Sequence, residues 1–344
     1  MKPFQPTCRI FGRDWNIRNA DVDLVTVMGQ VVLTIANWSV PDQMNRYLLP
    51  LMFVLASIAQ PVHADSSSPR LAAYYERQMA IVGTQTYAWI GDEPPAPLPF
   101  KAVQVGVGQS WFYVLTVAGS LIGFREDHAQ RIVLMSGLKW FASGRSGVLA
   151  IATDDTLWWM SRAGKNKQRI ADDVSAAAVG DGANYYITSS GALFVKGSAH
   201  RGQYGDGRLK STKRFVQTAT DARQITAHTG HAILLKASGD VLGTGGNIYG
   251  PVGRHGLGDK AVRWSKILSG ARSIATGSSH SLAIRKDGTL MAWGSSYGPE
   301  PKPVMSNAVA VAAGSRTTIA LRRDGSLWQW SGGHKPRKIL DVTK

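Results

Sequence analysis

The sequence predicts an all-β protein, a β-propeller, and three observations support this. A glycine-rich unit recurs six times, each time with a residue that ends a short apolar strand and a turn residue eleven positions later. An aliphatic residue follows two positions after each turn residue, and variable loops separate the units. Repeated units of four short strands are typical of propellers. The paired positions are Gly108/Gly119, Gly144/Asp155, Gly180/Gly191, His228/Gly239, Gly277/Gly288 and Gly314/Gly325.

Each unit predicts three strands and a fourth, outer one. The first is small and apolar, as in 308–312, and the second alternates, as in 281–284, so that Leu282 and Ile284 share a face. Asp287-Gly288 predicts a two-residue hairpin turn, because glycine accepts a positive φ. A third strand over 289–293 follows, and Pro303 in the fourth suits an edge position.

The repeat spacing predicts seven blades, with six as the alternative. Successive first members lie 36, 36, 48, 49 and 37 residues apart, so the extra length belongs in loops. Residues 78–82 and 86–90 resemble a second and a third strand without a first, and residues 338–342 supply an outer strand. We therefore expect the N- and C-terminal strands to share one blade and close the ring.

The N-terminal part predicts export. An apolar run over 47–59 follows Arg46 and precedes a small-residue ending at Ala64, as in a secretory signal peptide. We assign residues 44–64 to that signal, residues 1–43 to a non-native leader or a misassigned start, and residues 65–344 to one propeller, periplasmic or secreted. The only cysteine, Cys8, lies before the cleavage point, which excludes disulfide and thiol chemistry from residues 65–344.

The repeats resemble the RCC1 family (regulator of chromosome condensation), whose units contain a glycine, a histidine three positions on, an Asp-Gly turn and a closing Trp-Gly. Residues 277–294 match nearly throughout, Gly202-Gln203-Tyr204-Gly205 matches the tail of the motif, and the copies at Gly108, Gly144 and Gly180 lack the histidine. The resemblance implies a seven-bladed propeller used as a protein-binding platform. The chromatin role of the eukaryotic namesake conflicts with export.

Charge is the feature with the most functional content. Residues 65–344 keep 34 of the 39 Lys and Arg and 19 of the 23 Asp and Glu residues, a net +15. Segments that follow the third strand at 161–169, 198–214, 245–263 and 331–338 hold +13 of it. Equivalent segments of a repeat project from one face, so we expect a basic face; scattered charge that merely aids solubility is the alternative.

The candidate binding residues are the basic and aromatic side chains of these loops. Arg and Tyr are favoured interface anchors, and loops on a rigid scaffold usually carry binding residues. Trp111 and Trp264 fall outside the repeat pattern and are further candidates for exposed anchors. The candidates are Arg162, Lys165, Lys167, Arg169, Arg201, Tyr204, Arg208, Lys210, Tyr249, Arg254, Tyr297, Lys335 and Arg337.

These patterns favour a non-catalytic module that binds an unidentified, acidic protein. An anionic envelope polymer is the second hypothesis and an enzyme at the propeller mouth the third; export argues against genomic DNA, and we expect no cofactor or metal. His280 is expected to be buried, and His228 with His231 lacks a nearby carboxylate to complete a metal site. The acidic pairs Asp154-Asp155 and Asp172-Asp173 could act as acids or bases, but Asp154-Asp155 falls at a hairpin turn and Asp206 lies in a Gly-Asp-Gly turn, so turn chemistry is the stronger explanation.

Overall fold

The structure is a computed structural model that describes residues 70–126, 130–253 and 258–341, together with the backbone of four N-terminal strands. The chain divides into two units, Met1–His63 and Ala64–Lys344. In the first, β1 (Thr7–Ile10) pairs with β2 (Arg13–Asn16), and β3 (Asp21–Val27) pairs with β4 (Gln30–Ala36). The expected signal peptide at 44–64 lies outside the described residues. Among those residues, no helix is long and apolar enough to span a membrane.

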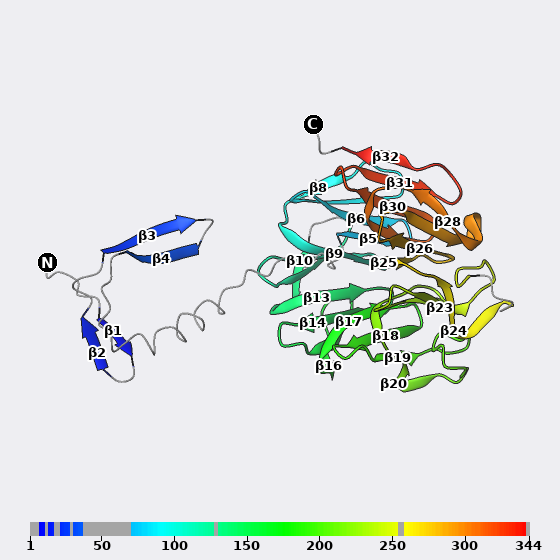
Figure 1. The fold of residues 1–344 in the computed structure, drawn as a ribbon, viewed down its shortest axis with the longest axis horizontal. Coiled ribbons are helices and arrows are strands. Elements are labelled where there is room, and N and C mark those ends of the chain that lie inside the picture. Colours follow the sequence, from blue (N-terminus) through cyan, green and yellow to red (C-terminus); the bar gives the residue numbers. More distant parts are fainter. Residues whose placement is uncertain are drawn as a thin grey trace. The chain divides into compact units, whose positions relative to one another are not determined.

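The second unit contains seven four-stranded antiparallel sheets in the part of the chain that the structure describes (Figure 1). The first three blades are β5 (Leu71–Tyr74), β6 (Arg77–Val82), β7 (Gln85–Ile90) and β8 (Ala96–Leu98); β9 (Ala102–Gly108), β10 (Trp111–Thr116), β11 (Leu121–Phe124) and β12 (Arg131–Met135); and β13 (Leu138–Ser143), β14 (Val148–Ala152), β15 (Leu157–Met160) and β16 (Gln168–Ala171).

The other four blades follow in chain order. They are β17 (Val174–Val179), β18 (Ala183–Thr188), β19 (Leu193–Gly197) and β20 (Thr212–Ala219); β21 (Ala222–Ala227), β22 (His231–Lys236), β23 (Val241–Gly246) and β24 (Lys260–Leu268); β25 (Ala271–Thr276), β26 (His280–Arg285), β27 (Leu290–Gly294), the 3-10 turn η1 (Ser295–Tyr297) and β28 (Gly298–Met305); and β29 (Ala308–Ala313), β30 (Thr317–Arg322), β31 (Leu327–Ser331) and β32 (Arg337–Leu340).

The seven-bladed all-β propeller is confirmed, but the expected shared blade is wrong. Every blade is built from four consecutive strands. β5 pairs with β6 and completes the first blade, and β32 is the outer strand of the last blade. The first strand of blade one escaped the repeat pattern because it ends in Tyr74-Tyr75, where the other blades have glycine or histidine.

The ring closes through side chains and one backbone contact between the last and first blades, which Figure 1 shows side by side in red and cyan. Trp89 Nε1 donates to Gln329 Oε1 at 2.7 Å, and the Ser315 amide donates to the Tyr75 carbonyl at 3.1 Å. Leu71 of the first blade is buried in one apolar cluster with Ile319 of the last. Packing thus replaces the strand exchange that the sequence suggested.

The recurring glycine that ends the first strand is required by contacts around the channel. A Cβ on Gly277 would lie 2.5 Å from the Gly314 carbonyl oxygen, and a Cβ on Gly314 would lie 2.2 Å from that of Tyr75. A Cβ on Gly108 would likewise lie 2.8 Å from the Gly144 carbonyl oxygen. The first strands of these neighbouring blades therefore meet backbone to backbone, which leaves no room for a side chain at Gly108, Gly277 or Gly314.

The turn residue eleven positions later has a conformational role. Gly119, Gly191, Gly239, Gly288 and Gly325 have φ between 74° and 89°, and Asp155 also has a positive φ of 67°. The carbonyl of the turn residue accepts a hydrogen bond from the first strand of the next blade, as in Ala308 N to Gly288 O at 2.9 Å. The spacing is fixed because this one residue both turns the hairpin and joins two blades.

The core lies between blades. The aliphatic residues two positions after each turn residue are all fully buried. Trp293 is also fully buried, and its Nε1 donates to the Pro251 carbonyl of the preceding blade at 2.8 Å. The tryptophans at this repeat position hold neighbouring blades together, as the sequence suggested.

Candidate binding surface

The connections of the propeller lie on two opposite faces. Because each blade is antiparallel, the connections after its first and third strands reach one face, and those after its second and fourth strands reach the other. We call the first the loop face; among the described residues it comprises 75–76, 91–95, 109–110, 125–126, 130, 144–147, 161–167, 180–182, 198–211, 228–230, 247–253, 258–259, 277–279, 295–297, 314–316 and 332–336. The second is the turn face; it comprises the tight hairpins and inter-blade turns, such as 117–120, 153–156, 172–173, 189–192 and 286–289.

The basic candidates lie in or next to the long connections of the loop face. Arg162 is half-buried and donates to Gln109 Oε1 at 2.9 Å, whereas the other described basic candidates are exposed. Arg254 lies outside the described residues. The exposed ones are Lys165, Lys167, Arg169, Arg201, Arg208, Lys210, Lys335 and Arg337.

Ion pairs divide this set. Arg208 pairs with Asp206 at 2.6 Å, Arg169 with Asp172 at 2.5 Å, and Arg337 with Asp92 at 3.6 Å. Five of the exposed candidates have no ion-pair partner among the described residues and stay available to an outside anion: Lys165, Lys167, Arg201, Lys210 and Lys335. Their positive field therefore extends into solvent, screened only by salt.

The aromatic candidates differ in exposure. The prediction that Tyr204 is exposed is wrong: its side chain is fully buried, and its hydroxyl donates to the Gly197 carbonyl at 2.8 Å. Tyr297 is half-buried, because its hydroxyl accepts the Trp330 Nε1 hydrogen bond between two blades at 2.7 Å. Tyr249 is 63% exposed and its neighbour Ile248 is 67% exposed. Tyr249 is therefore the aromatic candidate free to contact a partner.

The loop that carries Tyr249 is held from within. Asn247 Oδ1 accepts the Val252 amide at 3.3 Å, and the Gly250 amide donates to the Asn247 carbonyl at 2.9 Å. The Pro251 carbonyl accepts both Trp293 Nε1 and Ser281 Oγ at 2.8 Å. A loop fixed in this way exposes Ile248 and Tyr249 without the ordering cost that a mobile loop adds to binding.

The two irregular tryptophans are structural. A Cβ on Gly205 would lie about 2.5 Å from the indole of Trp264, so this ring packs flat on the 198–211 loop, and the Trp264 amide donates to the Gly205 carbonyl at 3.0 Å. Trp111 is half-buried and stacks on Tyr113, with 6.2 Å between ring centroids. The expectation of exposed anchors at these positions is wrong, because both rings cover neighbouring loops or strands.

Side chains from three blades meet at the loop-face end of the channel. The Tyr74 hydroxyl donates to Asp181 Oδ1 at 2.6 Å, and the Tyr74 ring stacks on His228 at 5.0 Å. Burial and the hydrogen bond to Asp181 raise the pKa of Tyr74. This contact joins blades one, four and five across the ring. Sequence reasoning missed it, although Asp181 directly follows a repeat glycine and His228 occupies a glycine position, which are both signals of a channel location.

The repeat histidines connect neighbouring blades. His231 Nε2 lies 3.1 Å from Ser281 Oγ, and His280 Nε2 lies 3.1 Å from Thr318 Oγ1 of the following blade. His228 Nδ1 lies 2.9 Å from Thr229 Oγ1. The expected burial of His280 is confirmed, at 3% exposure. Among the described residues, no three His, Cys, Asp or Glu side chains are grouped as metal ligands.

Buried neutral histidines predict acid lability. Burial, followed by the charges of the neighbouring histidines, lowers the pKa of His231 from 6.5 to about 3 and that of His280 to about 4. Once the pH falls below about 6.5, these two histidines therefore bind protons in the unfolded chain but stay neutral in the native state. We expect the contribution of these histidines to the free energy of unfolding to be constant above that pH and to fall progressively down to about pH 3. Urea midpoints measured at pH 7.5, 5.5 and 4.5 test this, and a flatter pH dependence is expected for H231Q/H280Q.

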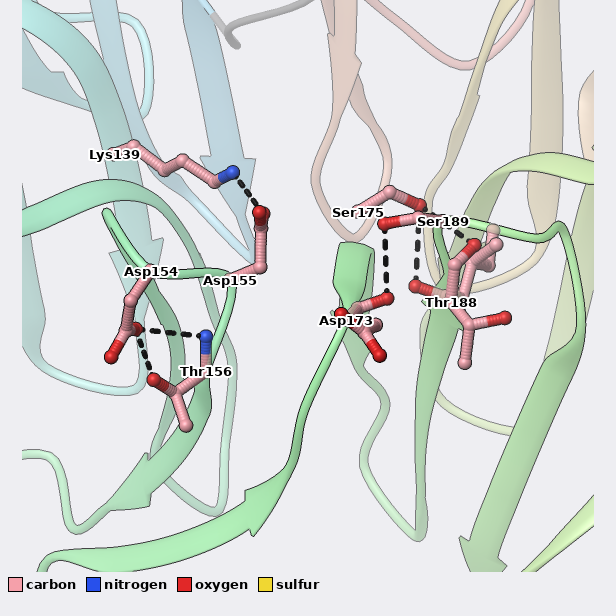
Figure 2. A network of polar contacts seen from close by, with 9 residues as sticks. Lys139, Asp154, Asp155, Thr156, Asp173, Ser175, Thr188 and Ser189 are labelled. Atoms are coloured by element: carbon pink, nitrogen blue, oxygen red, sulfur yellow. Dashed lines mark hydrogen bonds and ion pairs between the residues drawn. The ribbon is translucent and has the colours of Figure 1, made fainter.

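The acidic pairs are turn residues, as their positions favoured. Figure 2 shows Asp154 capping Thr156, whose amide donates to Asp154 Oδ1 at 3.0 Å, and Asp155 in contact with Lys139. The Asp173 carbonyl accepts Ser189 Oγ at 3.1 Å. Hydrogen bonds from Thr156 lower the pKa of Asp154. These carboxylates lie on the turn face, and their positions are set by backbone turns.

Fold and loops together define a class: a seven-bladed β-propeller with long basic loops on one face. The family model for the regulator of chromosome condensation (RCC1) repeat matches residues 271–298, which include the sixth blade's first three strands. The sixth blade of the propeller is thus similar to an RCC1 repeat, as the resemblance of its motifs indicated.

Relatives of this chain include known RCC1-like proteins. It is 33% identical over 114 residues to the regulator of chromosome condensation of Drosophila melanogaster, covering 31% of this chain and 21% of that protein. It is 25% identical over 194 residues to the X-linked retinitis pigmentosa GTPase regulator homolog of Caenorhabditis elegans, covering 49% of this chain and 14% of that protein. The chain thus spans about a fifth or less of the length of these curated relatives.

Solved structures show the same fold. Prp20p from Saccharomyces cerevisiae, studied for its binding to Gsp1p and histones, matches with a TM-score of 0.65 at 15% identity, over 73% of this chain and 81% of that one. Human WBSCR16 matches with a TM-score of 0.61 at 14% identity, over 74% and 86% of the two chains. Relatives of this class suggest a protein-interaction or regulatory module.

Proposed function

We propose that this chain is an extracytoplasmic, non-catalytic binding module whose loop face holds a protein with an acidic surface. One observation supports it above the others: unpaired, exposed cations at 165, 167, 201, 210 and 335 lie on the same face as the exposed pair Ile248 and Tyr249. An apolar anchor surrounded by charges is the usual composition of a protein-binding surface.

The occupied polar groups support a non-catalytic role. The interior histidines are engaged with hydroxyls of their own or adjacent blades, and the acidic pairs are engaged in turns. A catalytic constellation needs a nucleophile, a base and an orienting group in contact. Related proteins also point to binding, since Prp20p is known for binding Gsp1p and histones.

The proposed location rests on the sequence pattern of residues 44–64. Cleavage after Ala64 leaves a chain that begins at Asp65. N-terminal sequencing of the exported protein tests this: a first residue at Asp65 supports the proposal, and an intact N-terminus in the cytoplasm contradicts it.

Comparative affinity capture tests the proposed surface. Three versions of residues 65–344 are immobilised: the natural chain, the loop-face variant K165E/K167E/R201E/K210E, and the turn-face variant K101E/R285E/K286E/R323E. The two variants carry the same net charge, and all eight positions are exposed. We expect a discrete cell-envelope protein to be retained by the natural chain and the turn-face variant and to be lost from the loop-face variant.

Two outcomes contradict the proposal. Retention of that protein by the loop-face variant excludes the loop face as the contact. Retention of anionic polymer alone, reduced equally in both variants and eluted by salt, favours charge-driven polymer binding instead.

A further inference from the structure

A pocket of about 730 Å³ opens on the loop face at the mouth of the channel, where blades one, two, three and seven meet. Its size is within the usual range of ligand sites. The repeat pattern and the charge count do not predict this pocket, because much of its lining comes from the short connections after the first strands. It is lined by Tyr75, Glu76, Arg77, Gly91, Asp92, Gln109, Ser110, Arg145, Ser315, Arg316, Thr317 and Ser331.

Two guanidinium groups of the pocket are free. Arg77 pairs with Glu126, and Asp92 pairs with Arg337 at 3.6 Å. Arg145 and Arg316 are exposed, and neither has an ion-pair partner within the described residues. Glu76 is the one pocket carboxylate left without an ion pair there, so the pocket has an excess of one positive charge. Guanidinium binds carboxylates through two parallel hydrogen bonds.

Tyr75 provides the floor beside the channel. Its φ of 52° places it in the left-handed region, which is costly for a tyrosine. The Tyr75 carbonyl accepts a hydrogen bond from the Ser315 amide. The Tyr75 ring lies edge-on to the Tyr74 ring, with 4.9 Å between the centroids, and its centroid is 6.0 Å from that of the His228 ring. Tyr75 is nonetheless 39% exposed. A strained residue thus presents an immobilised aromatic surface to the pocket.

We propose that this pocket binds a short acidic peptide segment, whose carboxylates pair with Arg145 and Arg316 and whose backbone packs on Tyr75. The proposal rests on the proposed function and identifies the part of the partner that enters the ring: an exposed loop or chain end containing Asp or Glu. The hydroxyls of Ser110, Ser315 and Thr317 could hydrogen-bond the peptide groups.

The lining favours a peptide over simpler or denser anions. A volume of about 730 Å³ far exceeds what a single phosphate or carboxylate fills. Glu76 opposes a dense polyanion, because it would repel one of two closely spaced negative groups. Hydroxyls, an aromatic ring and two guanidinium groups from different blades match carboxylates spaced along a polyamide backbone.

Fluorescence anisotropy with a labelled, C-amidated penta-glutamate peptide tests the site, with penta-glutamine as the neutral control. We expect the glutamate peptide alone to bind. R145A/R316A should weaken that binding at least about tenfold, and E76Q should tighten it about two- to fivefold. R285A/R323A removes the same charge on the turn face and should change the affinity less than about twofold. Circular dichroism establishes that each variant is folded.

Three results would overturn the pocket assignment. The first is equal weakening by R145A/R316A and R285A/R323A, which would mean diffuse attraction. The second is displacement of the peptide by inorganic phosphate at comparable concentration, which would mean a simple anion site. The third is no peptide binding at all. If one of these results occurs but the loop-face variant still fails to retain the captured protein, the pocket assignment is wrong and the proposed function stands.

Discussion

Gly314→Ala is expected to destabilise the propeller by about 3 kcal/mol. The new Cβ would lie 2.2 Å from the Tyr75 carbonyl oxygen, at the junction where the last blade meets the first. That oxygen also accepts the Ser315 amide, so relieving the clash strains a backbone hydrogen bond. Gly277→Ala should cost a similar amount, because its Cβ would meet both Gly314 O and the His280 ring.

Urea unfolding followed by circular dichroism measures this effect through the midpoint at constant slope. Gly333→Ala is the matched control, since its Cβ would meet nothing closer than 3.6 Å and should change the free energy of unfolding by less than about 0.5 kcal/mol. A cost below about 1 kcal/mol for Gly314→Ala would show that the first strands can separate, contrary to the tight ring described above.

The loop-face charge reversal is expected to reduce affinity for the captured protein at least about 100-fold. Each exposed ion pair contributes about 0.2–1 kcal/mol, and reversal adds repulsion of similar size at each of four sites. The total, discounted for coupling between Lys165 and Lys167, is about 3 kcal/mol. Surface plasmon resonance at two salt concentrations measures it. The loss should occur mainly in the association rate and should shrink as salt rises, because steering by exposed charges is screened.

The turn-face variant again serves as the reference. Its four reversed positions lie on the opposite connections and should change the affinity less than about threefold. Comparable losses in the two variants would mean that net charge, not the arrangement of the loop face, controls binding.

The fixed spacing of the repeat explains which parts of the fold could be predicted from the sequence. The glycine at 277 and the turn residue at 288 each serve one backbone requirement, and each recurs with fixed spacing, so the strands between them were predictable. The worn copy at Asp155 keeps the left-handed φ, which shows that the requirement belongs to the position and not to glycine. The first strand, Leu71–Tyr74, has no such marker and was missed.

The site was less predictable than the fold. Position in the repeat correctly assigned Lys165, Arg201 and Tyr249 to exposed loops, because loop location follows from strand order. Exposure of a particular side chain depends on contacts between distant residues, and Tyr204 is buried because its hydroxyl bonds Gly197 within its own loop. Arg145 and Arg316 are far apart in the sequence and line one pocket only because the fold brings blades one, three and seven together.

Amide hydrogen exchange of the complex with the captured protein tests the central claim most directly. We expect slowed exchange in the loop-face connections, above all 161–167, 198–211 and 247–253, with 144–147 and 314–316 protected where the partner enters the channel mouth. The turn-face hairpins at 117–120, 153–156, 189–192 and 286–289 should exchange as in the free chain. Protection confined to those hairpins, or to the outer strands, would contradict the assignment of the loop face as the binding surface.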